Sequence, residues 1–251
     1  MIQLSVNVNK IATLRNSRGG NIPNLVELSH KILAWGASGI TIHPREDERH
    51  IRRSDIQPLC KMLQEFNAEP ENAYKELNIE GDPSPRFLEI CQEFRPNQAT
   101  LVPVTPGEIT SDHGFQFPKD LEILETFVEK LKEFGIRVSV FVEAGVENLH
   151  LVKALGVDRV ELYTGPFAHA FDEDPRKAKE IYSKYEATAR EALSLGLGVN
   201  AGHDLDSRNL EIFRNLSGLL EVSIGHRLIS DALEWGLERT IQIYQSVLNP
   251  L

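Results

Sequence analysis

An alternation of short apolar runs with amphipathic helical segments, repeated along the chain, is the feature that most limits which fold this sequence can adopt. Eight runs have the apolar period of two that is typical of β-strands, and most of them end in Asn, His, Glu, Pro or Gly. These runs are residues 3–9, 39–43, 76–80, 99–103, 137–142, 159–164, 198–203 and 220–226. Because a helical pattern follows most of them, the sequence predicts a parallel sheet covered by helices.

Four of the predicted helices stop at a glycine, which fits the left-handed position that follows the last residue of many helices. These helices span residues 24–35, 121–134, 146–155 and 178–195, and Gly36, Gly135, Gly156 and Gly196 follow them. Further helical candidates are residues 58–66, 85–94 and 208–215, and residues 232–248 are predicted to form the terminal helix.

Eight strand–helix units in 251 residues match the size of a (β/α)8 TIM barrel, and we predict this α/β fold. No linker or low-complexity segment divides the chain, so residues 1–251 are expected to form a single barrel domain. An open, doubly wound sheet is the alternative. It is less favoured because no GxGxxG motif follows the first strand.

The overall charge limits the classes of partner. A formal net charge of −10 argues against nucleic acid or an anionic membrane, because both select basic surfaces, but it leaves small anions possible. Cys60 and Cys91 are too few for a disulfide framework and lack a CxxC spacing, which favours a reducing compartment. The amino terminus does not resemble a signal peptide, and no apolar run approaches the roughly 20 residues of a membrane helix. We therefore expect a cytoplasmic protein.

Polar and charged residues gather where the predicted strands end. The segment 39–50 shows this most clearly, because the apolar run Ile40-Thr41-Ile42 is followed by two histidines, two arginines and three acids. In a parallel barrel the carboxyl ends of the strands meet at one face, where ligands bind. The residues expected at this face are Asn7, Asn9, Lys10, His43, Arg45, Glu80, Pro103, Glu143, Glu161, Thr164, Asn200, His203, Gly225 and His226. A plain polar turn remains the alternative for 39–50, and a hydrogen-bonded barrel layer for Asn7 and Asn200.

Three of these residues suit acid–base chemistry. His43 and His203 supply imidazoles, a group that ordinarily titrates near neutrality, and burial can raise the pKa of a carboxyl group such as that of Glu80 into the same range. A divalent-metal site built from His43, His203 and His226 is an alternative use of the histidines. The sequence offers no HxH or HExxH pair in its support, so we expect no metal.

Two segments could bind phosphate. The glycine-rich run 16–20 places Arg18 in a flexible loop whose guanidinium and backbone amides suit an anion, although a plain solvated loop is an equal alternative. The turn 223–226 follows the eighth strand, where barrels often bind phosphate with glycine amides and a helix N-terminus.

Six segments, taken together and in this order, resemble the pyridoxine 5′-phosphate synthase family of vitamin B6 biosynthesis. They are residues 6–19, 39–50, 77–80, 101–103, 199–203 and 224–226. The resemblance implies a (β/α)8 barrel with extra helices, assembled as a homo-octamer. It further implies that 1-deoxy-D-xylulose 5-phosphate is condensed with 3-amino-2-oxopropyl phosphate to pyridoxine 5′-phosphate, phosphate and water, without metal or organic cofactor.

Roles for individual residues follow from the same resemblance. It implies that His43 and Glu80 accept protons, that His203 donates one, and that Glu161 assists the transition state. The implied contacts to the aminoketone phosphate are Asn7, Arg18, Gly225 and His226, and those to deoxyxylulose phosphate are Arg45, His50 and Thr110.

The chain departs from the family pattern at three positions that are expected to contact substrate. Asn9 and Lys10 stand where many members have Asp-His, and Asp204 stands where they have glycine. Lys10 can still donate hydrogen bonds to a sugar, and Asp204 can offer its backbone amide. The carboxylate of Asp204 would repel a phosphate unless it points away.

Two other functions suit a phosphate-binding barrel. One is a phosphosugar isomerase or epimerase that uses Glu80 and His43 as its two bases. The other is a catalytically silent barrel that binds a phosphorylated metabolite.

Overall fold

The computed structural model describes residues 1–105, 108 and 111–250, and it contains a closed barrel of eight parallel strands in sequence order. The strands are β1 (Gln3–Asn7), β2 (Gly39–Ile42), β3 (Glu76–Gly81), β4 (Gln98–Leu101), β5 (Arg137–Val142), β6 (Arg159–Tyr163), β7 (Gly198–Gly202) and β8 (Leu219–Ile224). Strand β1 pairs with both β2 and β8, which closes the sheet. The predicted (β/α)8 barrel is confirmed, and the open sheet is wrong.

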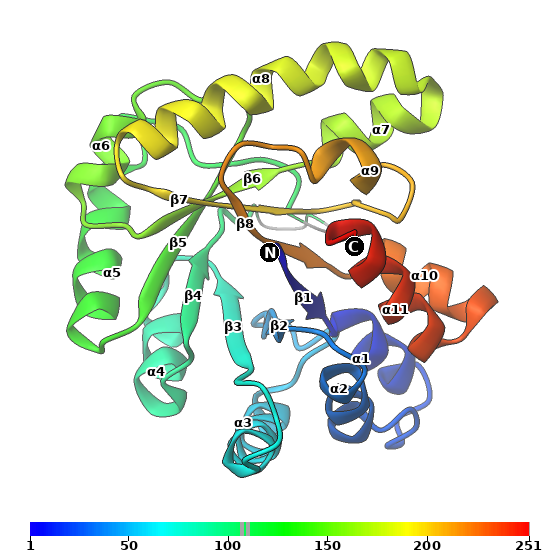
Figure 1. Cartoon of the computed structure of the whole chain (residues 1–251). Coiled ribbons are helices and arrows are strands. Elements are labelled where there is room, and N and C mark those ends of the chain that lie inside the picture. Colours follow the sequence, from blue (N-terminus) through cyan, green and yellow to red (C-terminus); the bar gives the residue numbers. More distant parts are fainter. Residues whose placement is uncertain (106–107, 109–110, 251) are drawn as a thin grey trace.

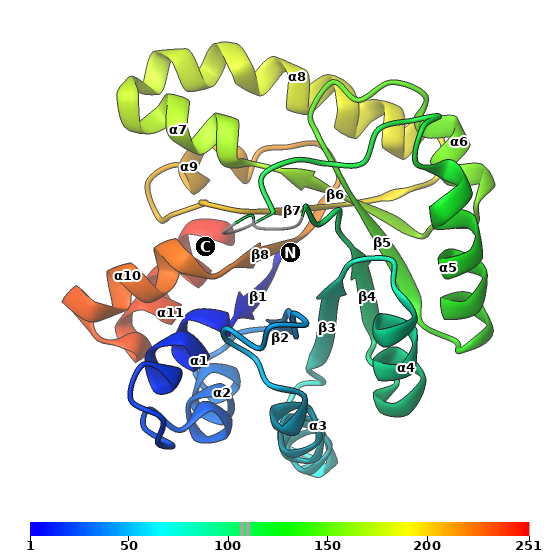
Figure 2. The ribbon, with the colours of Figure 1, turned by 180° about the vertical axis from the view of Figure 1, so that it is seen from behind.

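Helices surround the strands on the outside of the barrel (Figures 1 and 2). They are α1 (Asn9–Asn16), α2 (Leu25–Ala34), α3 (Arg53–Ala68), α4 (Pro85–Phe94), α5 (Leu121–Glu133), α6 (Leu149–Ala154), α7 (Gly165–Glu173), α8 (Pro175–Ser194), α9 (Leu210–Phe213), α10 (His226–Trp235) and α11 (Leu237–Leu248). Second helices follow β1, β6 and β8, so the barrel carries the extra helices that the resemblance implied.

The glycine stops were predicted correctly, but the terminal helix was not. Gly36, Gly135, Gly156 and Gly196 all have positive φ. The single terminal helix expected over 232–248 is instead two helices, α10 and α11, because Gly236 between them has φ 81° and ends the first. Helix α1 and helix α7 were not predicted.

A second boundary error concerns α3, which begins at Arg53 rather than at Pro58. Its start is fixed by Asp55, whose carboxylate accepts a hydrogen bond from the Arg52 amide at 2.8 Å and so satisfies the helix start. Pro58 lies inside the helix, although proline is usually confined to the first turn.

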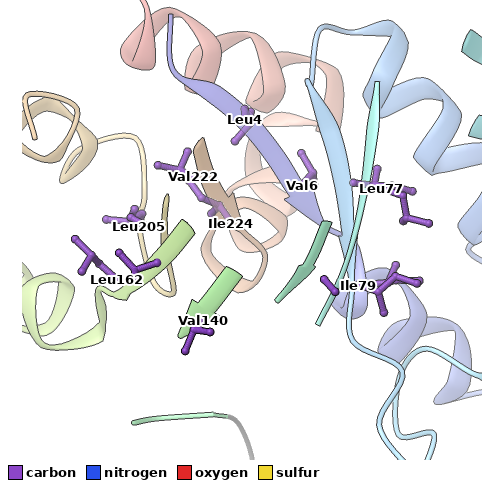
Figure 3. Close-up of a cluster of buried hydrophobic side chains, with 14 of the residues drawn as sticks. Leu4, Val6, Leu77, Ile79, Val140, Leu162, Leu205, Val222 and Ile224 are labelled. Atoms are coloured by element: carbon purple, nitrogen blue, oxygen red, sulfur yellow. The ribbon is translucent and has the colours of Figure 1, made fainter. Parts of the chain in front are cut away.

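The two faces of the barrel strands differ in polarity. Successive side chains of a strand point to opposite faces, so Leu4 and Val6 of β1 point outward. They lie in the fully buried apolar layer between strands and helices, which Figure 3 shows in part. The intervening residues face inward and are polar: Ser5 bonds Thr41 at 2.7 Å, and Asn78 bonds both Thr41 and Thr100. Branched apolar side chains usually fill such barrels, so a hydrogen-bonded interior is unusual for the fold.

Asn200 belongs to this interior layer. Its side chain accepts a hydrogen bond from Arg159 at 3.2 Å and donates one to Gln98 at 3.4 Å. Asn200 therefore lies in a hydrogen-bonded layer of the barrel, which was the alternative to a role in substrate binding. No helix in the part of the chain that the structure describes is long and apolar enough to cross a membrane.

Candidate active site

A cavity of about 580 Å³ opens at the carboxyl-terminal ends of the strands. It brings together most of the residues singled out from the sequence: Asn7, Asn9, Lys10, His43, Arg45, His50, Glu80, Glu161, His203, Asp204, Gly225 and His226. Ser223, from the predicted phosphate-binding turn, also lines it, together with residues that were not named individually from the sequence: Thr13, Arg49, Val102, Ser111 and Phe141. A hollow at the opposite end, beside Gln3 and Glu221, has only about 10 Å³, roughly the space of one water.

His43 and Glu80 meet in this cavity from neighbouring strands. The Nδ1 atom of His43 lies 3.8 Å from Oε2 of Glu80, and Asn7 donates a hydrogen bond to the same oxygen at 3.3 Å. Burial, reinforced by the positive charge of Arg45, lowers the pKa of His43 well below its usual range. His43 is therefore neutral and forms no ion pair with Glu80. Its imidazole can act as a base beside the carboxyl group.

Glu80 is poised between its two protonation states at neutral pH. Burial raises the pKa of Glu80 to about 7, and Arg45 opposes this rise. A carboxyl group with such a pKa can both accept and return a proton at neutral pH.

Glu161 lies on β6 as a second buried acid. Burial, and then the negative charge of Glu80, raise the pKa of Glu161 well above its usual range. Its Oε2 atom is buried and has no hydrogen-bond partner among the residues with described positions. A Cβ atom added at Gly202 would lie 2.4 Å from Oε1 of Glu161, so the glycine leaves room for this side chain.

His203 follows β7 and pairs with its neighbour in sequence. Its Nδ1 atom lies 3.1 Å from Oδ2 of Asp204. The Asp204 carboxylate therefore points toward an imidazole, and the hydrogen bond from His203 lowers the pKa of Asp204. Both side chains are largely buried, with 24% and 18% of their surface exposed.

Basic groups occupy two regions of the cavity. Gly225 precedes the N-terminus of α10, whose first residue is His226, and Lys10 lies close enough to lower the pKa of His226 in addition to burial. In the other region burial, and then Arg45, lower the pKa of His50 to about 4. Helix N-termini and guanidinium groups both bind phosphate, so the cavity suits a ligand or ligand pair with two phosphate groups.

Comparison with known proteins identifies the family. Residues 4–250 match the family model described as pyridoxal phosphate biosynthesis protein PdxJ. The chain belongs to the PdxJ family. It is 55% identical to a pyridoxine 5′-phosphate synthase of Leptospira biflexa, covering 99% of this chain and 98% of the relative. It is 47% identical to a protein of the same name from Bacteroides fragilis, covering 99% and 100%.

Solved structures show the fold that this PdxJ family member shares with other barrels. One is a 3-hexulose-6-phosphate synthase from Salmonella typhimurium, with a TM-score of 0.63, 12% identity and 98% of both chains covered. Another is the alpha subunit of tryptophan synthase from Legionella pneumophila, with a TM-score of 0.61, 10% identity, and 100% of this chain and 93% of the other covered. At these identities the likeness concerns the fold alone.

Several residues that hold the PdxJ site in place were missed by sequence reasoning. Arg86 of α4 donates to the carbonyl oxygens of Pro44 at 2.6 Å and Arg45 at 3.3 Å, and so fixes the loop after β2. The guanidinium of Arg45 in turn donates to Glu108 at 3.1 Å and to Ser111 at 3.3 Å. These partners are 41 to 66 residues apart in sequence, so no local pattern could have paired them.

Arg15 of α1 has a structural role near the cavity. It is buried, pairs with Asp55 at 2.6 Å through one guanidinium nitrogen, and donates to the His50 carbonyl at 3.3 Å through another. Asn16 donates to the same carbonyl at 2.8 Å. These contacts hold the backbone of His50 at the rim of the cavity.

Two predicted binding residues are not part of the observed cavity wall. Arg18 is exposed and does not line the cavity. Thr110 lies outside the described residues. Their roles stay predictions.

The three histidines considered as an alternative metal site, His43, His203 and His226, do not form a compact ligand group. Across residues 1–105, 108 and 111–250, the group of potential ligands within 4.8 Å of one another is Glu108, Asp112 and His113. Glu108 is already engaged by Arg45, and Asp112 by His113 at 3.0 Å. We derive no metal chemistry from this cluster, since exposed acidic groups are common without a cation.

Proposed function

We infer that this chain catalyses the pyridoxine 5′-phosphate synthase reaction. The substrates would be 1-deoxy-D-xylulose 5-phosphate and 3-amino-2-oxopropyl phosphate, and the products pyridoxine 5′-phosphate, phosphate and water. The observation that carries this inference is the convergence of His43, Glu80, Glu161 and His203 on one cavity in a chain that matches PdxJ relatives over its full length.

The reaction is a series of proton transfers, and the cavity holds groups suited to each direction. The amine attacks a ketone, water and phosphate leave, and a carbon–carbon bond closes the ring before it becomes aromatic. We propose that Glu80 and His43 remove protons, since one is poised near neutrality and the other is kept neutral by burial. His203 would return a proton to a leaving oxygen.

Glu161 has a different task in this proposal. Since burial and Glu80 keep it protonated, it offers a neutral hydrogen-bond donor to charge that develops on the substrate. The two acids titrate together, because the charge of Glu80 opposes ionisation of Glu161.

The two phosphate groups would occupy the two basic regions. We propose that Asn7, Asn9, Lys10, Asp204, Gly225 and His226 contact the aminoketone phosphate or the neighbouring sugar, and that Arg45 and His50 contact deoxyxylulose phosphate. Asp204 would take part through its backbone amide, because its carboxylate is turned toward His203. Arg18 and Thr110 are kept as proposed contacts from the resemblance alone.

Three broader expectations also remain proposals. We propose that residues 1–251 form one domain, that the protein assembles as a homo-octamer, and that it works in the cytoplasm. Gel filtration with light scattering would test the assembly.

The decisive test is to incubate the purified protein with both substrates in the presence of a chelator. Pyridoxine phosphate absorbance and stoichiometric release of inorganic phosphate are the expected results. Folded protein that forms no product would overturn the proposal. Each substrate alone in deuterated water is the control: deuterium entering a single sugar phosphate would support an isomerase, and tight binding without any turnover would support a silent barrel.

A further inference from the structure

Two consecutive residues in the turn after β7 have a positive φ, which residues other than glycine rarely adopt. His203 has φ 89° and Asp204 has φ 56°. Such conformations persist only where the surrounding structure fixes them, and they cluster at functional sites.

Buried side chains fix the carbonyl groups of this turn. The Thr164 hydroxyl lies 2.6 Å from the Gly202 carbonyl oxygen and also contacts that of His203. The Asn209 amide donates to the Asp204 carbonyl at 3.2 Å. Thr164 and Asn209 are fully buried, so the turn is built into the core of the molecule and is not a loose loop.

The consequence of this backbone is that two adjacent side chains face each other. Oδ2 of Asp204 lies 3.1 Å from Nδ1 of His203. An ionised carboxylate can only accept, so Nδ1 is the nitrogen that carries the hydrogen, and Nε2 is the nitrogen through which the ring would serve a substrate. The ring of Tyr163 on β6 packs in a T-shaped arrangement with that of His203, 5.1 Å between centroids, and supports the same orientation.

We propose that Asp204 is a positioning residue, which fixes the tautomer of His203 and stabilises its protonated form so that Nε2 can deliver a proton. This proposal deepens, and rests on, the proposed synthase function. In the step concerned, the N–H bond at Nε2 breaks as an O–H bond forms on the departing oxygen. The C–O electron pair leaves with that oxygen as water, and neutral imidazole remains beside the Asp204 carboxylate.

Other charged and titratable groups surround the pair and bear on its pH dependence. They are Asp112 from the loop after β4, Tyr163 of β6, His169 of α7, and His226 and Arg227 of α10. Arg227 is engaged by Asp172, which reduces its pull on the Asp204 carboxylate.

The test compares Asp204→Asn, which keeps a hydrogen-bond acceptor without the charge, with Asp204→Gly, which removes both and relieves the left-handed backbone. Nitrogen NMR of labelled protein without substrate, assigned with His203→Gln, reads the His203 tautomer. We expect hydrogen on Nδ1 in the native protein and a shift toward Nε2 in Asp204→Gly. An unchanged tautomer would overturn the positioning role, whether or not the enzyme proves active.

Steady-state kinetics then read the catalytic consequence. We expect kcat at pH 8 to fall by roughly 10-fold in Asp204→Asn and by up to about 100-fold in Asp204→Gly, with KM values within about 3-fold. The deficit should shrink toward pH 6, because a higher proton concentration protonates the imidazole without the carboxylate. A deficit that is independent of pH, or one confined to KM, would contradict the proposal. An inactive native enzyme would overturn the synthase function and leave the NMR result to decide the tautomer.

Asp112→Asn is the matched control. It also removes one negative charge near His203, but Asp112 is exposed and pairs with His113. We expect the tautomer of His203 to stay unchanged in this variant. A change as large as in Asp204→Gly would show that charge alone, and not the contact, sets the state of the ring.

Discussion

The Oε2 atom of Glu80 lies 3.8 Å from Nδ1 of His43, so a buried acid and a buried base from neighbouring strands face the same cavity. Their pKa values move in opposite directions for one shared reason. Burial disfavours the charged form of each, which raises the pKa of the Glu80 carboxyl and lowers the pKa of the His43 imidazole. At neutral pH the His43 imidazole is therefore neutral, and the Glu80 carboxyl group exchanges between its protonated and ionised forms.

Glu80→Gln is expected to lower kcat by about 10² to 10⁴ with small changes in KM, because the amide keeps the shape of the side chain but accepts no proton. Rates of pyridoxine phosphate formation measure the effect, and circular dichroism checks the fold. Retention of more than about a tenth of native kcat would rule out Glu80 as an essential base.

The stability of the protein should also depend on Glu80. Its pKa is about 7 in the folded protein against an ordinary value of 4.5, so the folded state holds the proton more tightly than the unfolded state. Linkage then requires that this stabilisation is complete below pH 4.5 and is lost as the pH rises through about 7. Native protein should lose stability relative to Glu80→Gln over this range, by up to about 3 kcal/mol.

Urea unfolding of both proteins at pH 5 and pH 8 measures this difference. Glu161→Gln is the matched variant, because it removes the second coupled acid from the same cavity. A stability difference between native protein and Glu80→Gln that does not change with pH would contradict the assigned protonation of Glu80.

Gly202→Ala tests whether the position of Glu161 matters. The added methyl group would meet Oε1 of Glu161 at 2.4 Å, so the acid must move. We expect a loss of stability of about 1 to 3 kcal/mol from the forced shift, and a lower kcat without any contact between residue 202 and the substrate. Gly20→Ala is the control for stability, since nothing lies within 4 Å of a Cβ atom there.

Arg15→Ala should destabilise the protein by about 3 to 5 kcal/mol, since it removes a buried guanidinium and leaves the largely buried Asp55 carboxylate without its ion-pair partner. The KM for substrate should rise as well, because the His50 carbonyl loses one of its donors. A double-mutant cycle with Asp55→Ala measures the coupling. The exposed pair of Lys31 and Glu27 is the control and is expected to contribute no more than about 1 kcal/mol. Equal effects for the two pairs would contradict the structural role of Arg15.

The sequence by itself determined the eight strands, most of the helices that separate them, and the residues at the strand ends. Strand periodicity and glycine stops such as Gly36 are local patterns, so they can be recognised from the sequence alone. The order of the motifs was sufficient to suggest the family. The positions of His43, Glu80 and His203 at one rim then followed from the barrel that these units predict.

Only the tertiary structure decided what surrounds those residues. The pairing of β1 with β8, the contact of Arg86 with the loop after β2, and the burial of Arg15 all join segments distant in sequence. The raised pKa of Glu80 has the same origin, because desolvation depends on how many segments enclose a group. The sequence shows which side chains are present, but their burial and their contacts depend on the folded structure.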